Sequence, residues 1–81
     1  MSLDWQSFEP VYGPVARYRQ LAEWIAGAVR QGDLKSGDAL PTEVQLADYT
    51  GLSVDTVRAA LKLLRDQGVI VTSQGIGSFI A

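Results

Sequence analysis

Cysteine and histidine are both absent from this sequence of 81 residues. The lack of cysteine excludes a disulfide framework, a thiol nucleophile and thiolate metal sites. The lack of both residues disfavours zinc and copper sites, and with them most acid–base catalysis near neutral pH. No apolar run approaches the roughly 20 residues that span a membrane, and no signal peptide is recognisable at the N-terminus. We therefore expect a cytoplasmic protein that is not an enzyme and has no metal, no other cofactor and no membrane partner.

What the sequence does contain indicates one small folded domain. Hydrophobic residues make up 47% and charged residues 20%, which is not the composition of a disordered chain. The net charge of −2 argues mildly against a nucleic-acid partner. The charge is uneven, however, because residues 1–52 hold four basic and seven acidic groups, whereas residues 53–81 hold three basic and two acidic groups. The C-terminal part therefore carries a local positive excess.

The N-terminal residues 1–13 are predicted to form an arm, and residues 14–81 to form the domain itself. Trp5, Phe8 and Tyr12 are scattered along the arm without a helical or strand period. One interpretation is that these aromatic residues fold back over apolar surface of the same chain. The alternative is that they cover a second copy of the protein.

A first helix is expected directly after Gly13. Proline is favourable at the first helical position, so the helix is placed from Pro14 to a C-terminal cap at Gly32. Its apolar residues recur with the period of one buried face: Val15, Tyr18, Leu21, Ala22, Ile25, Ala28 and Val29. Arg17 and Arg19 fall on the solvated side, where the alternative role is a contact with a phosphate.

A second, short helix is expected over roughly residues 43–50. Thr42 and Gln45 have the spacing of a capping box, and Gly51 ends the helix. Its buried side chains are expected to be Ala47 with either Val44 or Leu46.

A third helix follows after a very short turn. Ser53 caps it only two residues after Gly51, and a tight turn of this kind between helices is typical of a helix-turn-helix. The helix is expected over about residues 54–67. Its buried stripe should consist of Val57, Ala60, Leu61 and Leu64. Its basic residues, Arg58, Lys62 and Arg65, should lie on the opposite side.

The end of the chain predicts a β-hairpin. Residues 69–73 and 78–81 are β-branched and aromatic runs, and the loop 74–77 contains two glycines that permit positive φ angles. The order of elements predicts a mainly α fold with a small β-hairpin, a winged helix-turn-helix. In this fold the third helix is shaped to enter a major groove, and the hairpin forms a wing on the backbone or the minor-groove edge.

The sequence also resembles a known family over roughly residues 15–81. The motifs that carry the resemblance are "GD" and "LPTE" before the second helix, "LA" within it, "GLSVDTVRAALKLLRDQG" across the third helix and "GIGSF" in the hairpin. Together they resemble the DNA-binding domain of GntR-type (gluconate-repressor) bacterial transcription regulators. The resemblance implies a repressor or activator that binds a near-palindromic operator in double-stranded DNA as a homodimer. It also implies a C-terminal effector domain that these residues do not include, so the chain is either an excised domain or a small stand-alone regulator.

The resemblance assigns DNA contacts to particular residues. Arg58 aligns with a family contact to a base or a phosphate, whereas Lys62 and Arg65 are each open between a phosphate contact and plain surface. Ser53 is first a helix cap, and Thr56 has the alternative of bonding its own backbone. The predicted DNA-binding residues are Thr42, Ser53, Val54, Asp55, Thr56, Arg58, Lys62, Gln74, Gly75, Ile76 and Gly77.

Four residues depart from the family pattern. Val44, Val54 and Ile76 stand where the family commonly has a basic residue, and Asp55 where it commonly has a small polar one. Asp55 suits the helix dipole, or alternatively accepts from a cytosine amino group. Ile76 is interpreted as a minor-groove wedge, as a contact to another protein or as an isolated exposed apolar residue.

Two functions from different classes follow from these observations. The first is a sequence-specific DNA-binding transcription regulator. The second is a protein-interaction module that keeps the winged fold but has weak or lost DNA binding, as the acidic balance and the four departures would suit.

Overall fold

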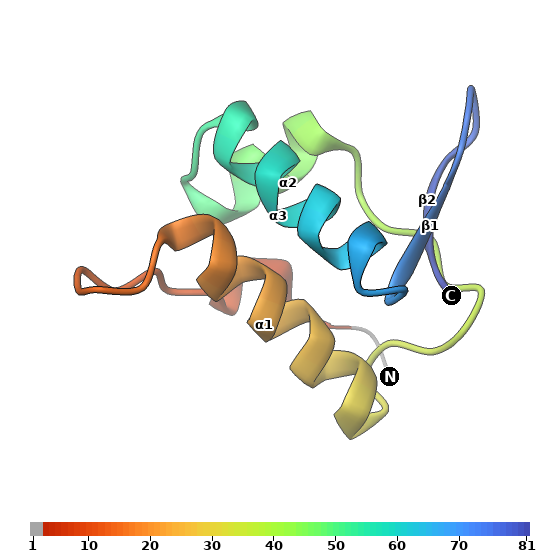
Figure 1. The fold of residues 1–81 in the computed structure, drawn as a ribbon, viewed down its shortest axis with the longest axis horizontal. Helices are drawn as coiled ribbons and strands as arrows, with labels where there is room; N and C mark the ends of the chain where they lie inside the picture. Colours follow the sequence, from red (N-terminus) through yellow and green to blue (C-terminus); the bar gives the residue numbers. More distant parts are fainter. Residues whose placement is uncertain (1–2) are drawn as a thin grey trace.

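A computed structural model describes residues 3–81 and has the predicted order of elements (Figure 1). It contains a short 3-10 turn, three α-helices and two strands. Their bounds are η1 Trp5–Ser7, α1 Arg17–Gln31, α2 Glu43–Thr50, α3 Val54–Asp66, β1 Ile70–Ser73 and β2 Gly77–Ile80. The two strands pair antiparallel as a hairpin. The prediction of a mainly α, winged helix-turn-helix arrangement is therefore confirmed.

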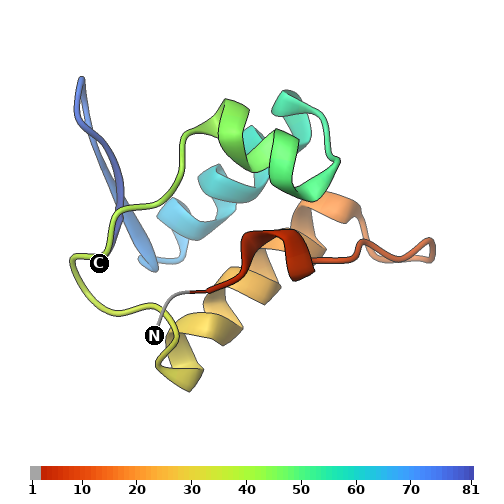
Figure 2. The same cartoon turned by 180° about the vertical axis from the view of Figure 1, so that it is seen from behind.

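The core forms where α1 packs against α3. Figures 1 and 2 show α1 on one side of the molecule and α2 with α3 on the other. The side chains between them are buried: Leu21, Ala22, Ile25, Ala28, Leu46, Val57, Ala60, Leu61, Leu64, Ile70 and Ile80. Each large apolar side chain removed from water in this way contributes about 1.5–3 kcal/mol to folding. The helical period predicted all of these residues except Ile70 and Ile80, which belong to the hairpin, and it left Leu46 as one of two alternatives. Two predicted members of the α1 stripe, Tyr18 and Val29, are half-buried.

The choice between Val44 and Leu46 in the second helix is decided by the fold. Leu46 is fully buried, whereas Val44 is 69% exposed. The third helix ends at Asp66, with Gln67 as its C-cap and Gly68 following at a φ of 76°. Its observed end therefore lies one residue before the expected one.

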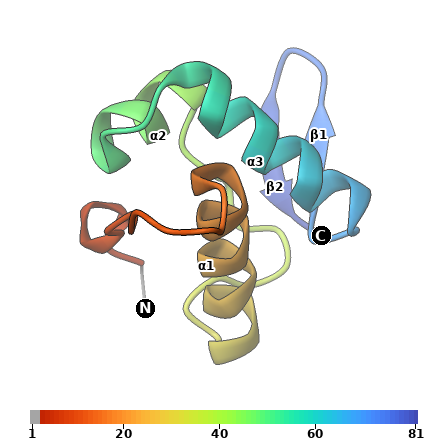
Figure 3. The ribbon, with the colours of Figure 1, turned by 60° about the vertical axis from the view of Figure 1, so that its left-hand side comes forward.

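The hairpin lies beside the C-terminal half of α3, on the far side from the N-terminal arm (Figure 3). Its register pairs Ile70 with Ile80 and Thr72 with Ser78. Compared with the expected bounds, β1 begins one residue later and ends at the same residue, whereas β2 begins and ends one residue earlier. The loop closes with a hydrogen bond from the Ile76 N–H to the Ser73 carbonyl at 3.0 Å. The left-handed φ of 80° at Gly75 is one that other residues rarely adopt.

The start of the first helix differs from the prediction. The helix begins at Arg17, so Pro14 and Val15 lie outside it. The cause is the side-chain amide of Gln20, which accepts from the Val11 N–H and donates to the carbonyls of Val11 and Val15, each at 2.8 Å. These bonds close residues 11–15 into a loop and occupy the Val15 carbonyl. Val15 is consequently 44% exposed and not part of the buried stripe.

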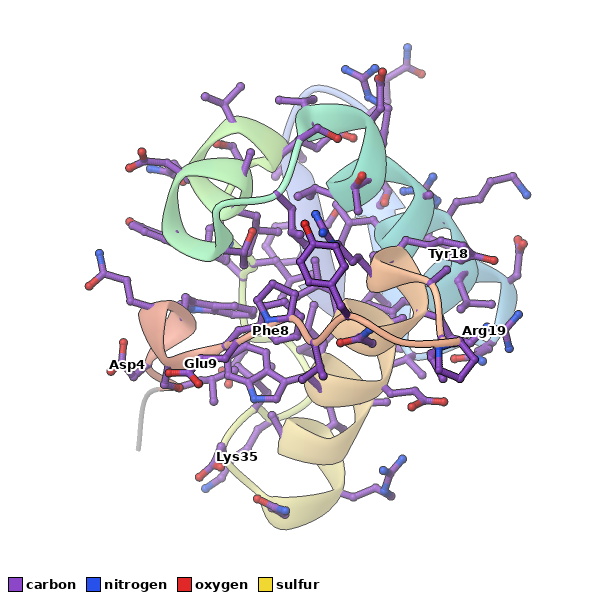
Figure 4. The ribbon with its side chains drawn as sticks, turned by 90° about the vertical axis from the view of Figure 1, so that its left-hand side faces the viewer. Asp4, Phe8, Glu9, Tyr18, Arg19 and Lys35 are labelled. Atoms are coloured by element: carbon purple, nitrogen blue, oxygen red, sulfur yellow. The ribbon has the colours of Figure 1, made fainter. Side chains whose placement is uncertain are left out.

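The arm folds back on its own chain, with Phe8 directed toward the body of the protein (Figure 4). Phe8 is buried, and its ring centroid lies 5.3 Å from that of Trp24, while Trp5 makes an edge contact with Trp24 at 5.8 Å. Tyr12 instead remains 88% exposed, with the guanidinium of Arg17 4.3 Å from its ring centroid. The fold-back interpretation is therefore confirmed for Trp5 and Phe8, but it is wrong for Tyr12. The division of the chain at residue 13 stays a prediction.

Candidate nucleic-acid interface

Three residues, 51–53, connect α2 to α3 and fix the direction of α3. Gly51 ends α2 in the left-handed conformation, and Leu52 is buried between the two helices. The hydroxyl of buried Thr50 donates to the Leu46 carbonyl at 2.7 Å and accepts from the Leu52 N–H at 3.3 Å. The buried hydroxyl of Thr50 is therefore fully hydrogen-bonded, and no buried side-chain polar atom of residues 3–81 lacks a partner. This tight connection is what a helix-turn-helix requires.

The outer face of α3 is basic. Arg58, Lys62 and Arg65 are all exposed, whereas the opposite face of the helix is buried in the core. The spacing of three and four residues places these cations along one side of the helix. The helix therefore presents a basic stripe to solvent, as predicted.

Carboxylates lie next to two of these cations. Arg58 Nε donates to both carboxylate oxygens of Glu43, at 3.2 and 3.3 Å, and its Nη1 lies 3.6 Å from Asp55 Oδ1. Lys62 Nζ lies 3.2 Å from Asp66 Oδ2, one helical turn along. Exposed ion pairs of this kind contribute at most about 1 kcal/mol to stability. Their larger effect here is to reduce the net positive charge of the stripe.

The first turn of α3 uses its hydroxyls for capping. The Ser53 hydroxyl accepts from the Thr56 N–H at 3.1 Å, and the two side-chain oxygens are 2.8 Å apart. Val54 is half-buried, whereas the side chain of Asp55 is 95% exposed. The cap interpretation of Ser53 is confirmed, and the Asp55 side chain is accessible to a partner.

A groove of roughly 420 Å³ runs between the start of α2, the outer side of α3 and the hairpin. Thr42 lies at one wall, where its hydroxyl accepts from the Gln45 N–H at 3.1 Å and the Gln45 side chain accepts from the Thr42 N–H at 2.9 Å. The capping box is therefore confirmed. The other wall is the hairpin loop, residues 74–77.

The hairpin loop projects beyond the body of the protein. Gln74, Gly75, Ile76 and Gly77 are exposed, and Ile76 at the tip is 75% exposed. Residues 69–81 include no charged side chain. The wing therefore presents main-chain groups and one apolar side chain to a partner.

The structure distributes the predicted residues over one face rather than a single pocket. Five of them, Thr42, Gln74, Gly75, Ile76 and Gly77, line the groove. Asp55 and Thr56 lie at the other end of α3 beside Ala16, Arg17 and Tyr18, and Lys62 borders neither depression.

Sequence reasoning missed two parts of this face. Glu43 was not predicted to touch Arg58, because the two residues are 15 apart and only the turn brings them together. Thr72 and Ser78 were not predicted to face the groove. Their register across the hairpin is the signal that would have found them.

Residues 3–81 contain neither a candidate metal site nor a candidate membrane-spanning helix. Within residues 3–81, no three or more carboxylates, histidines or cysteines gather where a metal ion would be held. Over the same range, no helix has both the length and the apolar character needed to cross a membrane.

Comparison with known sequences identifies a family. The sequence model described as "Bacterial regulatory proteins, gntR family" matches residues 17–80, which confirms the resemblance drawn from the motifs. The chain is 44% identical over 63 residues to the mannosyl-D-glycerate transport/metabolism system repressor MngR of Escherichia coli (strain K12), covering 78% of this chain and 26% of that protein. It is 32% identical over 73 residues to the histidine utilization repressor of Klebsiella aerogenes, covering 90% and 30% respectively. The chain thus spans less than a third of the length of these curated relatives.

Comparison with solved structures agrees. AraR(DBD) in complex with operator ORX1 matches with a TM-score of 0.80 and 32% identity, covering 91% of this chain and 95% of that chain. YtrA from Sulfolobus acidocaldarius, described as a GntR-family transcription factor, matches with a TM-score of 0.79 and 34% identity, covering 84% and 71%. These similarities confirm the winged helix-turn-helix fold.

Proposed function

The chain belongs to the gntR family of bacterial regulatory proteins, and from this membership we propose that it binds double-stranded DNA to regulate transcription. Its function is then binding rather than catalysis. A DNA partner also implies a cytoplasmic location, because that is where bacterial DNA is found. An effector-sensing domain stays a prediction from the family resemblance.

The observation that carries the proposal is the basic stripe of α3 beside the glycine wing. A major groove is wide enough for one α-helix, and α3 is presented by a connection of only three residues. The groove between α3 and the hairpin offers room for the DNA backbone next to that helix. Contacts with phosphates form within a few ångströms, so the position of individual cations on α3 matters more to binding than the net charge of −2.

Within this proposal the predicted residues have distinct roles. Arg58 reads a base edge or binds a phosphate from the middle of the exposed face, and Lys62 binds a phosphate further along the helix. Ser53, Val54, Asp55 and Thr56 form the end of α3 that is nearest to the bases. The residues of the groove wall and of the hairpin loop approach the DNA backbone: Thr42, Gln74, Gly75, Ile76 and Gly77.

The proposal includes pairing on a near-palindromic operator. One copy of α3 reads one half-site, so a homodimer on DNA would read two half-sites related by a twofold axis. The free chain is expected to be mainly monomeric at micromolar concentration, because Trp5 and Phe8 are occupied by contacts within their own chain. Sedimentation that shows a tight dimer without DNA would contradict this expectation.

One observation favours a second candidate function, a protein-interaction module. Val44, which follows the groove residue Glu43, is 69% exposed, and Ile76 in the hairpin loop is 75% exposed. Carboxylates also pair with Arg58 and Lys62. A surface of this kind suits a protein partner whose apolar side chains cover Val44 and Ile76.

Fluorescence anisotropy with a short random-sequence duplex, over a series of salt concentrations, tests the proposal. A DNA-binding protein should lose affinity linearly in log–log coordinates, with a slope of about −0.9 for each phosphate that is neutralised. Selection from a random pool of duplexes should then enrich one sequence, and that sequence should be near-palindromic if two copies bind.

A matched pair of variants makes the test specific. Arg58→Ala removes a cation from the proposed face, whereas Arg30→Ala removes one from the last turn of α1. Only the first change should weaken binding to the selected duplex. No salt-dependent binding of the unchanged protein to any duplex would instead favour the protein-interaction module.

A further inference from the structure

Arg65 is held differently from the other cations of α3. Its Nη1 donates to the Thr72 hydroxyl oxygen at 3.3 Å, and that oxygen lies 3.0 Å from the Ser78 hydroxyl oxygen. Thr72 and Ser78 are directly opposite each other across β1 and β2. A polar chain therefore runs from the last turn of the helix across both strands of the hairpin.

The chain of three side chains keeps unused hydrogen-bond donors. Only one hydrogen is shared between the Thr72 and Ser78 hydroxyls, so one of the two hydroxyl hydrogens remains available whichever way that bond runs. The Arg65 guanidinium has five N–H donors, and only one of them points to Thr72. The cluster is thus rich in donors and contains no acidic group.

Arg65 also differs from the other two cations in its charged neighbours. Among residues 3–81, Arg58 and Lys62 each have a carboxylate within 4.0 Å, whereas Arg65 forms no ion pair. The hairpin has no charged residue of its own. Arg65 is therefore the cation that lies next to the hairpin. The linked hydroxyls of Thr72 and Ser78 position its guanidinium and bring no negative charge beside it.

All three side chains line the groove between α3 and the hairpin. We propose that Arg65, Thr72 and Ser78 form a built phosphate-binding site for one backbone phosphate of double-stranded DNA. The site rests on the proposed function. It makes Arg65 a phosphate contact, a role that the sequence had left open, and it adds Thr72 and Ser78, which were not among the predicted contacts. A guanidinium with a flanking hydroxyl donor matches the oxygens of a phosphate. Thr72 and Ser78 act as positioning residues, because they orient Arg65 across the groove.

A purely structural role has a different consequence. If the Arg65–Thr72 bond only fastened the hairpin to α3, its loss would lower the melting temperature and leave the DNA contact unchanged. The salt dependence of binding separates the two roles, because it counts the phosphates that are neutralised.

The experiment compares Arg65→Gln with Arg30→Gln as a charge-matched control. Arg30 lies in the last turn of α1, and that end of α1 points away from the hairpin loop (Figures 1 and 3). Binding to a random-sequence duplex is followed by anisotropy from about 0.1 M to about 1 M salt. Arg65→Gln should lower the salt slope by about 0.9, which corresponds to about eightfold weaker binding at the low-salt end if the two proteins bind equally at the high-salt end. Arg30→Gln should leave the slope unchanged.

Variants of Thr72 test the positioning role. Thr72→Val keeps the shape and loses the hydroxyl, so binding should weaken about two- to fivefold. Thr72→Ser should restore it. Because Thr72 acts by positioning Arg65, Thr72→Val should weaken binding less in the Arg65→Gln background than in the unchanged protein.

Three outcomes bear on the site. A reduced slope for Arg65→Gln and rescue by Thr72→Ser support it. An unchanged slope in Arg65→Gln, with the unchanged protein still binding duplex in a salt-dependent way, overturns the site and leaves the proposed function standing. Absence of salt-dependent duplex binding by the unchanged protein overturns both.

Discussion

The two ends of α3 present their arginines in opposite ways. At the N-terminal end, Arg58 lies between the carboxylates of Glu43 and Asp55. At the C-terminal end, Arg65 is held by the neutral hydroxyl of Thr72. Both side chains are exposed and hydrogen-bonded, but Arg58 has carboxylates within 4.0 Å, whereas Arg65 has none among residues 3–81.

The difference shows that the attraction of a cation to DNA depends on the group that holds the cation in place. A carboxylate within 4 Å orients a guanidinium but also repels a phosphate, whereas a hydroxyl orients it without repulsion. The start of α3 should therefore gain most of its binding from directed contacts to bases, which suits specificity. The end of α3 should gain its binding from charge, which suits general affinity.

The largest effect is expected from Arg58→Ala, which removes the cation at the N-terminal end. One lost base or phosphate contact should cost about 1–3 kcal/mol of binding to the selected duplex. The fold should survive, because Arg58 lies outside the buried stripe. Anisotropy measures the affinity, and circular dichroism verifies folding. Unchanged affinity in a folded variant would remove Arg58 from the interface.

The next largest effect is expected from adding charge at the same end. Val54→Arg should steepen the salt slope by about 0.9, or about eightfold in affinity over a tenfold range of salt, if one phosphate is newly neutralised. Asp55→Asn should act in the same direction, at a loss of about 0.3–1 kcal/mol in helix-dipole stabilisation. The combined variant should bind more tightly and discriminate less.

Val54 is half-buried, so stability is the control for that variant. A lower melting temperature with no steeper slope would mean that Val54 packs against the protein rather than facing DNA. That result would move the DNA surface away from the start of α3.

A smaller effect is expected from Glu43→Gln, which makes the two ends of α3 more alike. The variant removes the charge opposite Arg58 but keeps a group that accepts a hydrogen bond. Because an exposed pair is worth at most about 1 kcal/mol, affinity for random duplex should rise about two- to fivefold while selectivity for the selected duplex falls. A fall in both affinities would show that Glu43 itself is needed for binding.

The smallest effect is expected from Lys62→Gln. Lys62 has the same formal charge as Arg65, but Asp66 lies 3.2 Å from its ammonium group. The variant should weaken binding to random duplex by less than about threefold, compared with about eightfold for Arg65→Gln. If Lys62→Gln and Arg65→Gln lose the same affinity for random duplex, a neighbouring carboxylate does not reduce a cation's contribution to binding, and the distinction between Lys62 and Arg65 is wrong.

The fold was predictable to a large extent because its signals are local. The capping box at Thr42, the cap at Ser53 and the left-handed Gly51 each depend on residues within three or four positions. The periodic apolar residues of α1 and α3 likewise identified most of the core. The start of α1 was missed because the side chain of Gln20 reaches nine residues back to Val11 and competes with the helix.

The candidate site was less predictable. The positions of the residues along α3 predicted which side chains face outward, and the exposure of Arg58, Lys62 and Arg65 confirms this prediction. The partners of those side chains were not visible, since Arg58 meets Glu43 across 15 residues and Arg65 meets Thr72 across the end of the helix. Which of the outward residues touch DNA stays a prediction.

By itself the sequence determined the presence of the three helices, the caps at Thr42 and Ser53, the tight turn and the glycine hairpin, because short-range hydrogen bonds and periodic apolar residues specify them. It also determined the family, through motifs that are contiguous in the chain. Only the tertiary structure decided the environment of each cation. That environment depends on distances of 3–4 Å between side chains from different elements, and a small change in how two helices pack would alter it. For the same reason, packing alone decided that Phe8 is buried and Tyr12 exposed.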